Sequence, residues 1–492
     1  MKRRGTPIAL LLAGCTVGPN YTRPVIPAPS QFAEASTAPG PSDVELAGWW
    51  SRFHDAMLTQ LIDRALAQNL DVQSAAARIR EARAREIVAG AAALPQVDAQ
   101  ASATRQRISE NAIPLPPGAG GGAPGGGNAV GFGLPGSEFN TFRVGFDASW
   151  EMDLFGRTRR SVEAARARTG EAIWNRRDLQ VTAAAEVAST YLRLRELQAR
   201  LATAEAELAR QERLERLVAA RARGGLVTGQ DLEQQRSERG AAAAAIPPLR
   251  AQAAAQIHAL GVLTGETPEA LIAELARPAA LPDSGAPVPP GLPSELLRRR
   301  PDIRAAEREL AASTADIGVA VADLYPKFSL TAAPSLVSTA LATLLSWGSR
   351  SYSVGAALDW PIFNGGRTRA NVAVANARQE EALIAYRKAI LVALQDVEDS
   401  LARTDSDRGQ LAALNDSLRT AARAEDIARA RYSGGLVTYS DVLQAQAQRL
   451  KLEDQVTQTK GALARDTAAL FKALGGGWPE LAQSETATGA QE

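Results

Sequence analysis

Two stretches of this chain, from Arg157 to about Arg223 and from Arg367 to about Ser433, contain no proline and a single glycine each. Alanine, arginine, glutamate and leucine dominate both stretches, and these residues have high helix propensity. At roughly 1.5 Å per residue, a helix of about 65 residues is about 100 Å long. No globular domain is that wide, so the sequence predicts an elongated, coiled-coil-like helical assembly.

Each predicted helix ends in the same five residues, Gly-Gly-Leu-Val-Thr, at 224–228 and at 434–438. Glycine directly after a helix adopts the left-handed conformation at little steric cost. The threonine, or the aspartate three residues after it, can cap a following helix. We therefore expect two long helical hairpins, whose second helices begin near Asp231 and Asp441 and whose turns lie at the same end of the assembly.

The two turns are 434 − 224 = 210 residues apart, and the same spacing relates Trp150 to Trp360 within matching segments. Upstream, Pro95 corresponds to Pro326, a spacing of 231 residues. The Gly/Pro-rich stretch 110–138 accounts for the difference and is typical of a long flexible loop. The chain is thus predicted to be an internal duplication, with a period too long for a solenoid. Its predicted parts are a signal peptide (1–14), a first repeat (15–265), a connecting segment (266–300), a second repeat (301–478) and a polar C-terminal tail (479–492).

Four segments alternate apolar with polar residues at the period of a β-strand: 96–106, 141–150, 327–332 and 351–360. Segments of about ten residues with one apolar face and aromatic residues near an end are typical of strands between lipid and a wet lumen. An antiparallel sheet half-covered by a soluble core alternates in the same way, so the strands alone leave both alternatives open. Together with the long helices, they favour an α+β fold with membrane-facing strands.

The N-terminus has the features of a targeting segment. A positively charged stretch (2–4) precedes a short apolar core, and the four residues Leu-Ala-Gly-Cys that end at Cys15 resemble the lipobox of bacterial lipoproteins. Cys15 is the only cysteine, which excludes a disulfide within the chain and a cysteine metal cluster. We predict that Cys15 carries a covalent lipid; the alternative is a short secretory signal in which Cys15 is incidental. No run of about 20 apolar residues follows it, so no membrane-spanning helix is expected.

The charge balance and the scarcity of reactive side chains argue against several classes of function. The chain has 55 basic and 54 acidic residues, a net charge of +1, which argues against a nucleic-acid partner. Its two histidines, His54 and His258, have no ligand-spaced neighbours, so neither a metal site nor a catalytic triad is expected. Gly120–Gly125 fits a dinucleotide-binding pattern but lies in the Gly/Pro-rich loop with no helix after it. We therefore predict that the protein is not an enzyme and has no cofactor besides the lipid on Cys15.

Five features occur in one order along the chain. They are the lipobox followed by TVGPNYTRP (16–24), LPSELLRRRPDI (292–303), WPIFNGGR (360–367), RYSGGLVTYSDVL (431–443) and the duplication itself. Together they closely resemble the TolC-like outer-membrane efflux proteins, specifically the NodT-type lipoprotein branch that works with resistance-nodulation-division pumps.

This resemblance implies a homotrimer that lies in outer-membrane lipid and extends into the periplasm. Each chain would give four transmembrane β-strands to a shared twelve-stranded β-barrel, and its antiparallel helical hairpins to a trimeric α-barrel. Four strands also leave two open edges, whose unpaired backbone groups are costly in hydrocarbon, so they must close with other copies. The implied function is a passive exit duct that receives substrates from a periplasmic adaptor and an inner-membrane resistance-nodulation-division transporter. The alternative is a non-conducting lipoprotein scaffold, or an enzyme anchored to the outer membrane.

The resemblance also implies a docking role for the two turns. The residues expected to contact the adaptor's helical hairpin are Gly224, Gly225, Leu226, Gly434, Gly435 and Leu436. Glycine lets a partner approach the backbone closely. The alternative is that these residues only end the helices.

A periplasmic gate is expected at the same turns. Tyr432 and Asp441 match the family's tyrosine and its first aspartate and would be the main polar members, with Asp231 a weaker candidate. Val437 and Gln444 stand where some relatives have arginine and many have a second aspartate, so we expect a closed end with fewer polar bonds. Three copies of Asp441 near a three-fold axis would favour cations. Alternatively, Asp441 only supports the start of its helix.

Overall fold

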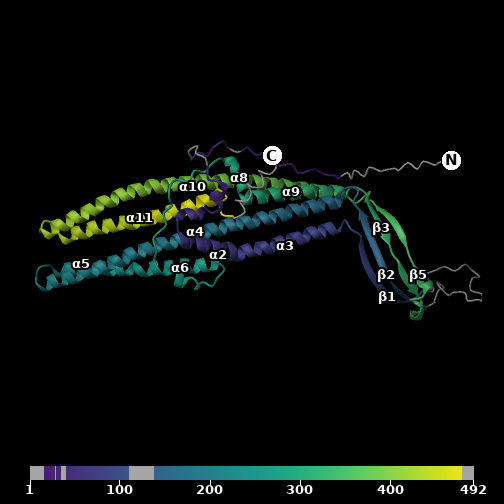
Figure 1. The fold of residues 1–492 in the computed structure, drawn as a ribbon, viewed down its shortest axis with the longest axis horizontal. Coiled ribbons are helices and arrows are strands. Elements are labelled where there is room, and N and C mark those ends of the chain that lie inside the picture. Colours follow the sequence, from purple (N-terminus) through teal and green to yellow (C-terminus); the bar gives the residue numbers. More distant parts are fainter. Residues whose placement is uncertain (1–15, 28, 35–39, 110–137, 479–492) are drawn as a thin grey trace, which may run out of the picture. The chain divides into compact units, whose positions relative to one another are not determined.

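The computed structural model describes residues 16–27, 29–34, 40–109 and 138–478, and it divides into two compact units (Figure 1). The described residues of the first unit fall within Met1–Thr22, Arg83–Ala167 and Ala311–Glu380, and those of the second within Arg23–Ala82, Arg168–Leu310 and Glu381–Glu492. Each unit therefore combines pieces of both predicted repeats. The predicted signal peptide, Cys15, the loop 110–138 except for its last residue, and the tail 479–492 lie outside the described residues.

Two unbroken helices dominate the described chain. Helices α4 (Arg157–Arg223) and α10 (Arg367–Ser433) span the two proline-free stretches, which confirms that prediction. The return arms of the hairpins begin with α5 (Gly229–Ala244) and α11 (Tyr439–Ala473). The other helices are α1 (Asp43–Ala47), α2 (Ala56–Gln68), α3 (Leu70–Ala91), α6 (Ile246–Leu263), α7 (Ile272–Leu275), α8 (Pro293–Arg299) and α9 (Pro301–Ala322), with 3-10 helices η1 (Trp49–Phe53), η2 (Leu341–Thr343) and η3 (Trp347–Ser349). Among the described residues, no helix combines the length and the apolar character that a membrane span requires.

The two return arms differ in continuity. Helix α11 runs for 35 residues without interruption, whereas α5 stops at Ala244 and α6 begins after Ala245. Pro247 and Pro248 lie in the first turn of α6. Proline cannot donate to the preceding turn and its ring clashes with that turn's carbonyl, so one continuous helix cannot pass through this point. A proline in the first turn of a new helix is tolerated, because the N–H groups there have no helical partner.

The first unit contains an antiparallel sheet. Its strands are β1 (Gln96–Arg107), β2 (Glu138–Met152), β3 (Lys327–Ala332), β4 (Ser335–Ser338), β5 (Arg350–Ser351) and β6 (Val354–Asp359). Strand β2 pairs with β1 along one edge, from Gln96 opposite Ser149 to Arg107 opposite Glu138. Along its other edge β2 pairs with β3 and with β4, which in turn pair with β6 and β5.

The strands of the second repeat are shorter than the sequence predicts. The segment 351–360 is not one strand, because β5 ends at Ser351 and β6 begins at Val354. Pro334 separates β3 from β4, and it has no N–H with which to continue the ladder. Its carbonyl still accepts from Phe146 at 2.9 Å, and the Ala333 N–H donates to Ser353 at 2.8 Å. The sequence does not predict β4, because Pro334 interrupts the strand pattern. Strand β4 nevertheless continues along β2, the strand with which β3 also pairs.

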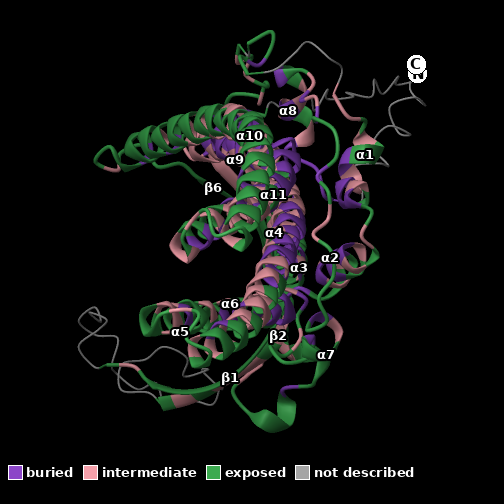
Figure 2. Cartoon of the chain, turned by 90° about the vertical axis from the view of Figure 1, so that its left-hand side faces the viewer, coloured by how far each residue is buried: buried purple, intermediate pink, exposed green. Residues whose placement is uncertain are grey.

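The core of the second unit lies where the chain's early helices meet the long ones. Trp49 stacks on Phe471 with ring centroids 5.4 Å apart, and the Tyr191 hydroxyl donates to Asp55 at 2.7 Å. Near the end of the described chain, Trp478 packs edge-on against Trp174 at 5.8 Å. Figure 2 shows buried residues along α4, whereas α5 is mostly exposed. This core holds the base of both hairpins, while their turns lie in solvent.

Candidate functional site

The two hairpin turns share one backbone geometry. The N–H of each turn leucine donates to the carbonyl of the arginine five residues earlier, Leu226 to Arg221 and Leu436 to Arg431, both at 2.9 Å. This bond is typical of a Schellman ending, which satisfies a free carbonyl at the end of a helix. The leucine side chains are 77% and 73% exposed. Each turn therefore offers one apolar side chain to the solvent.

The two glycines of each turn have different roles. Gly225 and Gly435 have φ of +71° and +70°, a conformation that other residues adopt only with strain. Gly224 and Gly434 have no such angle, and a Cβ added to either would meet nothing closer than 3.5 Å. The fold thus requires glycine only at the second position. The geometry of the turn does not require glycine at the first position, where it leaves the backbone uncovered.

Asp231 and Asp441 occupy the same place after the turns. Each carboxylate accepts from the backbone N–H of the threonine three residues before it, at 2.9 Å from Thr228 and at 2.8 Å from Thr438. The threonine hydroxyls donate to the same carboxylates at 2.8 and 2.6 Å. These bonds form capping boxes, and those to Thr438 lower the pKa of Asp441. Within one chain, both aspartates therefore stabilise the start of a helix.

Tyr432 belongs to a small aromatic and amide cluster. Its ring lies 5.4 Å from that of Tyr439, the first residue of α11. The Tyr439 hydroxyl donates to Gln235 of α5 at 2.6 Å, and the fully buried Gln235 donates to the side chain of Gln211 in α4 at 2.7 Å. Burial raises the pKa of Tyr439 to about 12, so it stays a neutral donor. This chain of bonds joins the two hairpins just below their turns.

A second link between the hairpins centres on Glu425 of α10, whose side chain is 4% exposed. Arg210 of α4 donates to it at 3.1 Å and Arg449 of α11 at 2.5 Å, and Arg429 also bonds to it. Nearby, Gln446 of α11 donates to Glu207 of α4 at 2.8 Å. We call Glu425 with its three arginines the Glu425 cluster. A buried carboxylate held by several fixed donors is costly to leave without them.

The turns can be predicted from the sequence, but this network cannot. Tyr439, Gln235 and Glu425 lie in Ala-, Glu- and Arg-rich helices, where charged residues usually cover a solvated face. The one useful signal is the spacing of four between Glu425 and Arg429, which suits a pair on one helix face. That spacing does not say which other helix covers the pair.

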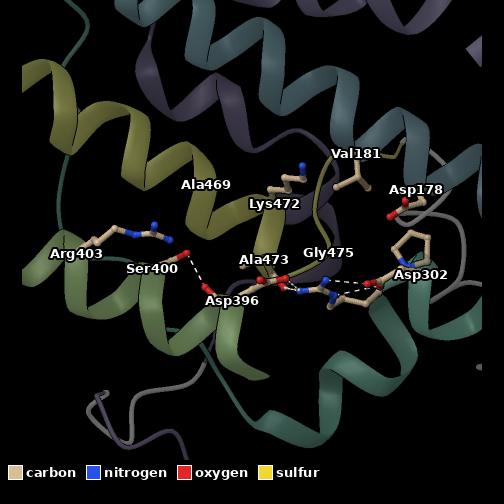
Figure 3. Close-up of a pocket in the computed structure, with 12 residues that line it drawn as sticks. Asp178, Val181, Asp302, Asp396, Ser400, Arg403, Ala469, Lys472, Ala473 and Gly475 are labelled. Atoms are coloured by element: carbon tan, nitrogen blue, oxygen red, sulfur yellow. Dashed lines mark hydrogen bonds and ion pairs between the residues drawn. The ribbon is translucent and has the colours of Figure 1, made fainter. Parts of the chain in front are cut away.

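A cavity of about 220 Å³ lies nearer the core, between α4, α9, α10 and α11 (Figure 3). Arg300 donates to Asp302 at 2.7 Å, to Asp396 at 2.9 Å and to the carbonyl of Ala473 at 3.2 Å. Burial and the neighbouring Asp302 raise the pKa of Asp178 in the same wall. The polar lining is largely used to fasten these helices to each other.

Nothing among the described residues points to a metal centre. No three histidine, cysteine, aspartate or glutamate side chains in that part of the chain gather closely enough to hold a metal ion. His54 lies in the turn after η1 with φ of 48°, and His258 lies within α6.

Comparison with known proteins agrees with this architecture. The model of the family "Outer membrane efflux protein" matches residues 61–266 and again 292–476. Among characterised relatives, the pyoverdine export outer membrane protein OpmQ of Pseudomonas aeruginosa is 36% identical over 95% of both chains, and outer membrane protein OprJ of the same organism is 33% identical over 96% of this chain and 95% of its own. The solved structure of the outer-membrane channel OprN superposes with a TM-score of 0.83 at 33% identity, covering 94% of this chain and all of OprN. The chain therefore belongs to the outer membrane efflux protein family and is an efflux protein of the outer membrane.

Proposed function

We propose that three copies of this chain form a passive exit duct, the outer-membrane part of a tripartite efflux pump. Each copy would contribute four strand paths, β1, β2, β3–β4 and β5–β6, to a shared twelve-stranded β-barrel. The hairpins α4–α5 and α10–α11 would line a tunnel through the periplasm. The observation that carries this proposal is the pair of like, solvent-exposed turns on two long hairpins in a chain of the efflux family.

The edges of the sheet support assembly. Strand β1 pairs only with β2, and β6 pairs only with β3, so each has one side without a partner in the described chain. Apolar side chains such as Val97 of β1, Phe146 of β2 and Leu358 of β6 are exposed on this sheet. Unpaired strand edges in lipid must be closed, and further copies of the chain would close them.

The duct can be tested with the purified full-length protein. Native mass spectrometry in detergent should give a trimer, and proteoliposomes should swell in isotonic solutions of small sugars. A trimer that leaves the vesicles unswollen even with Tyr432→Phe and Asp441→Ala, which should loosen the proposed closed end, would instead support a non-conducting scaffold. A monomer would contradict the shared barrel.

We also propose that the turns dock the periplasmic adaptor of the pump, whose inner-membrane component is a resistance-nodulation-division transporter. Gly224 and Gly434 support docking, because the turn itself does not require glycine there. The test is Gly434→Phe, with Gly435→Ala as the variant that strains the turn. Docking predicts that Gly434→Phe abolishes efflux while trimer and vesicle swelling persist. Retained efflux would leave the glycines as helix-ending residues only.

The gate is proposed at Tyr432 and Asp441, with Asp231 a weaker member. Tyr432 contacts Tyr439, which is bonded across to the first hairpin, so movement of the second hairpin would disturb both rings. Asp441 is exposed apart from its bonds to Thr438, and three copies near a common axis would concentrate negative charge. Asp231 provides a matched control, since it has the same capping role in the other hairpin.

We further propose that a lipid on Cys15 anchors the chain to the outer membrane. Thr16 follows Cys15, and with no aspartate at that position we expect sorting to the outer membrane. A lipid adds attachment of about 0.8 kcal/mol per buried CH₂. Mass spectrometry of the mature N-terminus should find Cys15 acylated and residues 1–14 removed. A free Cys15 thiol would refute the anchor without touching the duct.

A further inference from the structure

The segment Thr16–Asn20, which opens the TVGPNYTRP motif, lies against the junction between β2 and α4 in the first unit. The Val17 N–H donates to the carbonyl of Phe155 at 3.1 Å. Thr16 touches Gly156, because a Cβ built on that glycine would lie 2.8 Å from Thr16 Cγ2. The segment is therefore held by contacts with residues that precede α4 directly.

Arg160 in the first turn of α4 provides the main hold. The residue is 3% exposed. Its Nε donates to the Val17 carbonyl at 3.2 Å, and its Nη2 donates to the Gly18 carbonyl at 3.3 Å and to Asn20 Oδ1 at 2.7 Å. Its Nη1 donates to Glu163 at 2.7 Å. Three of these four acceptors come from the N-terminal segment. Without that segment, the buried guanidinium of Arg160 would keep Glu163 as its single partner, which is costly for a buried charge.

Glycines make the fit between the backbones close. Gly18 has φ of +88°, and a Cβ on it would lie 2.5 Å from the Cα of Gly318 in α9. A Cβ on Gly318 would lie 2.7 Å from Arg160 Cγ. Side chains at these positions would separate the segment from α9 and push the guanidinium away from its acceptors. The surface is thus shaped for this segment and for no bulkier one.

We propose that Gly156, Arg160 and Gly318 form a seat for the segment Thr16–Asn20, and that this seat delivers the acylated N-terminus to the junction of β2 and α4. The inference rests on the proposed lipid at Cys15. Because Thr16 lies against Gly156, a lipid on the preceding residue starts within one residue, or about 3.5 Å of chain, of this junction. Without the seat, the same lipid could attach wherever its tether reaches. The seated segment Thr16–Asn20 thereby places the anchor at the level where β2 ends and α4 begins.

A nitroxide at position 19 tests the seat in the acylated, full-length trimer. Pro19 is exposed, and the thiol of Pro19→Cys is the only free one once Cys15 is acylated. We expect a strongly immobilised spectrum in this parent. In Arg160→Met and in Gly318→Ala the rotational correlation time should fall several-fold, with an intermediate fall in Arg160→Lys, which keeps the charge but not the fork of donors.

The matched control is Arg166→Met, which removes an arginine from the same helix whose side chain is 70% exposed and pairs with Glu86. It should leave the spectrum unchanged. An immobilised spectrum in folded Arg160→Met, Arg160→Lys and Gly318→Ala trimers would overturn the seat. Mass spectrometry of each protein reports acylation separately. If Cys15 is not acylated, the lipid proposal fails, and the same spectra in a Cys15→Ser background still decide whether the segment is seated.

Discussion

The two hairpins end in the same turn but are built differently below it. Both turns have a left-handed second glycine, an exposed leucine and a Thr–Asp capping box. Below the turns, the first hairpin returns through α5 and α6 with a break at Ala245, and the second returns through the continuous α11. At the 210-residue offset, Gly229 stands where the second hairpin has Tyr439.

The glutamates that correspond in the two hairpins show the same contrast. Glu215 is 24% exposed and pairs with Arg236 and Arg239 of its own hairpin. Its counterpart Glu425 is 4% exposed and also binds Arg210 of the other hairpin. The turns of the two repeats are thus alike, while Glu425 and Tyr439 of the second hairpin bond across to Arg210 and Gln235 of the first. We infer that the two turns share the proposed docking role and that the second hairpin carries the bonds that join the two hairpins.

The largest effect is expected at the Glu425 cluster. Glu425→Ala removes a buried carboxylate that binds three arginines, of which Arg210 and Arg449 each keep another carboxylate, so the loss should be about 2–3 kcal/mol of the free energy of unfolding. Glu215→Ala removes two ion pairs with half-exposed arginines, which solvent already screens, and should cost about 0–1 kcal/mol. Thermal unfolding of both variants in detergent measures the difference. Equal losses would show that the two glutamates are equivalent and that the bonds of Glu425 to the other hairpin add no stability.

A smaller and equal effect is expected at the turns. Gly225→Ala and Gly435→Ala each force a side chain into the left-handed region, at about 1–2 kcal/mol. Gly434→Ala meets no close atom and has no unusual φ, so it should stay within about 0.5 kcal/mol of the unaltered protein. The same thermal measurement applies. A markedly larger loss at one of the two left-handed glycines would mean that the turns are not alike.

The smallest effect concerns Asp407 of α10, which occupies the position of the fully buried Leu197 in α4. Burial, with the neighbouring Asp466 of α11, raises the pKa of Asp407 to about 6. The folded state therefore keeps this proton longer than the unfolded state, so stability falls as the pH rises from about 4 to about 6. Asp407→Asn should slightly raise the thermal midpoint above pH 6 and leave it unchanged near pH 4. A midpoint shift independent of pH would contradict this assignment.

The sequence predicts what depends on local chemistry and leaves open what depends on packing. The bounds of α4 and α10, the turns and the capping aspartates follow from proline, glycine, threonine and aspartate at fixed positions. The bonds of Glu425 to Arg210 and of Tyr439 to Gln235 could not be predicted, because they join residues about 200 apart whose helices could each have met another neighbour. Prolines mark the break between β3 and β4 and the split of α5 from α6. The alternation and the helix propensity on either side of these prolines continue unchanged, so alternation and propensity alone do not show the interruptions.

We propose that this chain forms a conducting duct whose closed end lies at the second hairpin. Single-channel recording in planar bilayers tests it directly, with unaltered protein, Tyr432→Phe, Asp441→Ala and the matched control Asp231→Ala. We predict discrete, cation-preferring steps, more frequent opening in Tyr432→Phe and Asp441→Ala, and a much weaker change in Asp231→Ala. Absence of steps in every protein would contradict the duct, and equal behaviour of the two aspartate variants would reduce Asp441 to a helix cap.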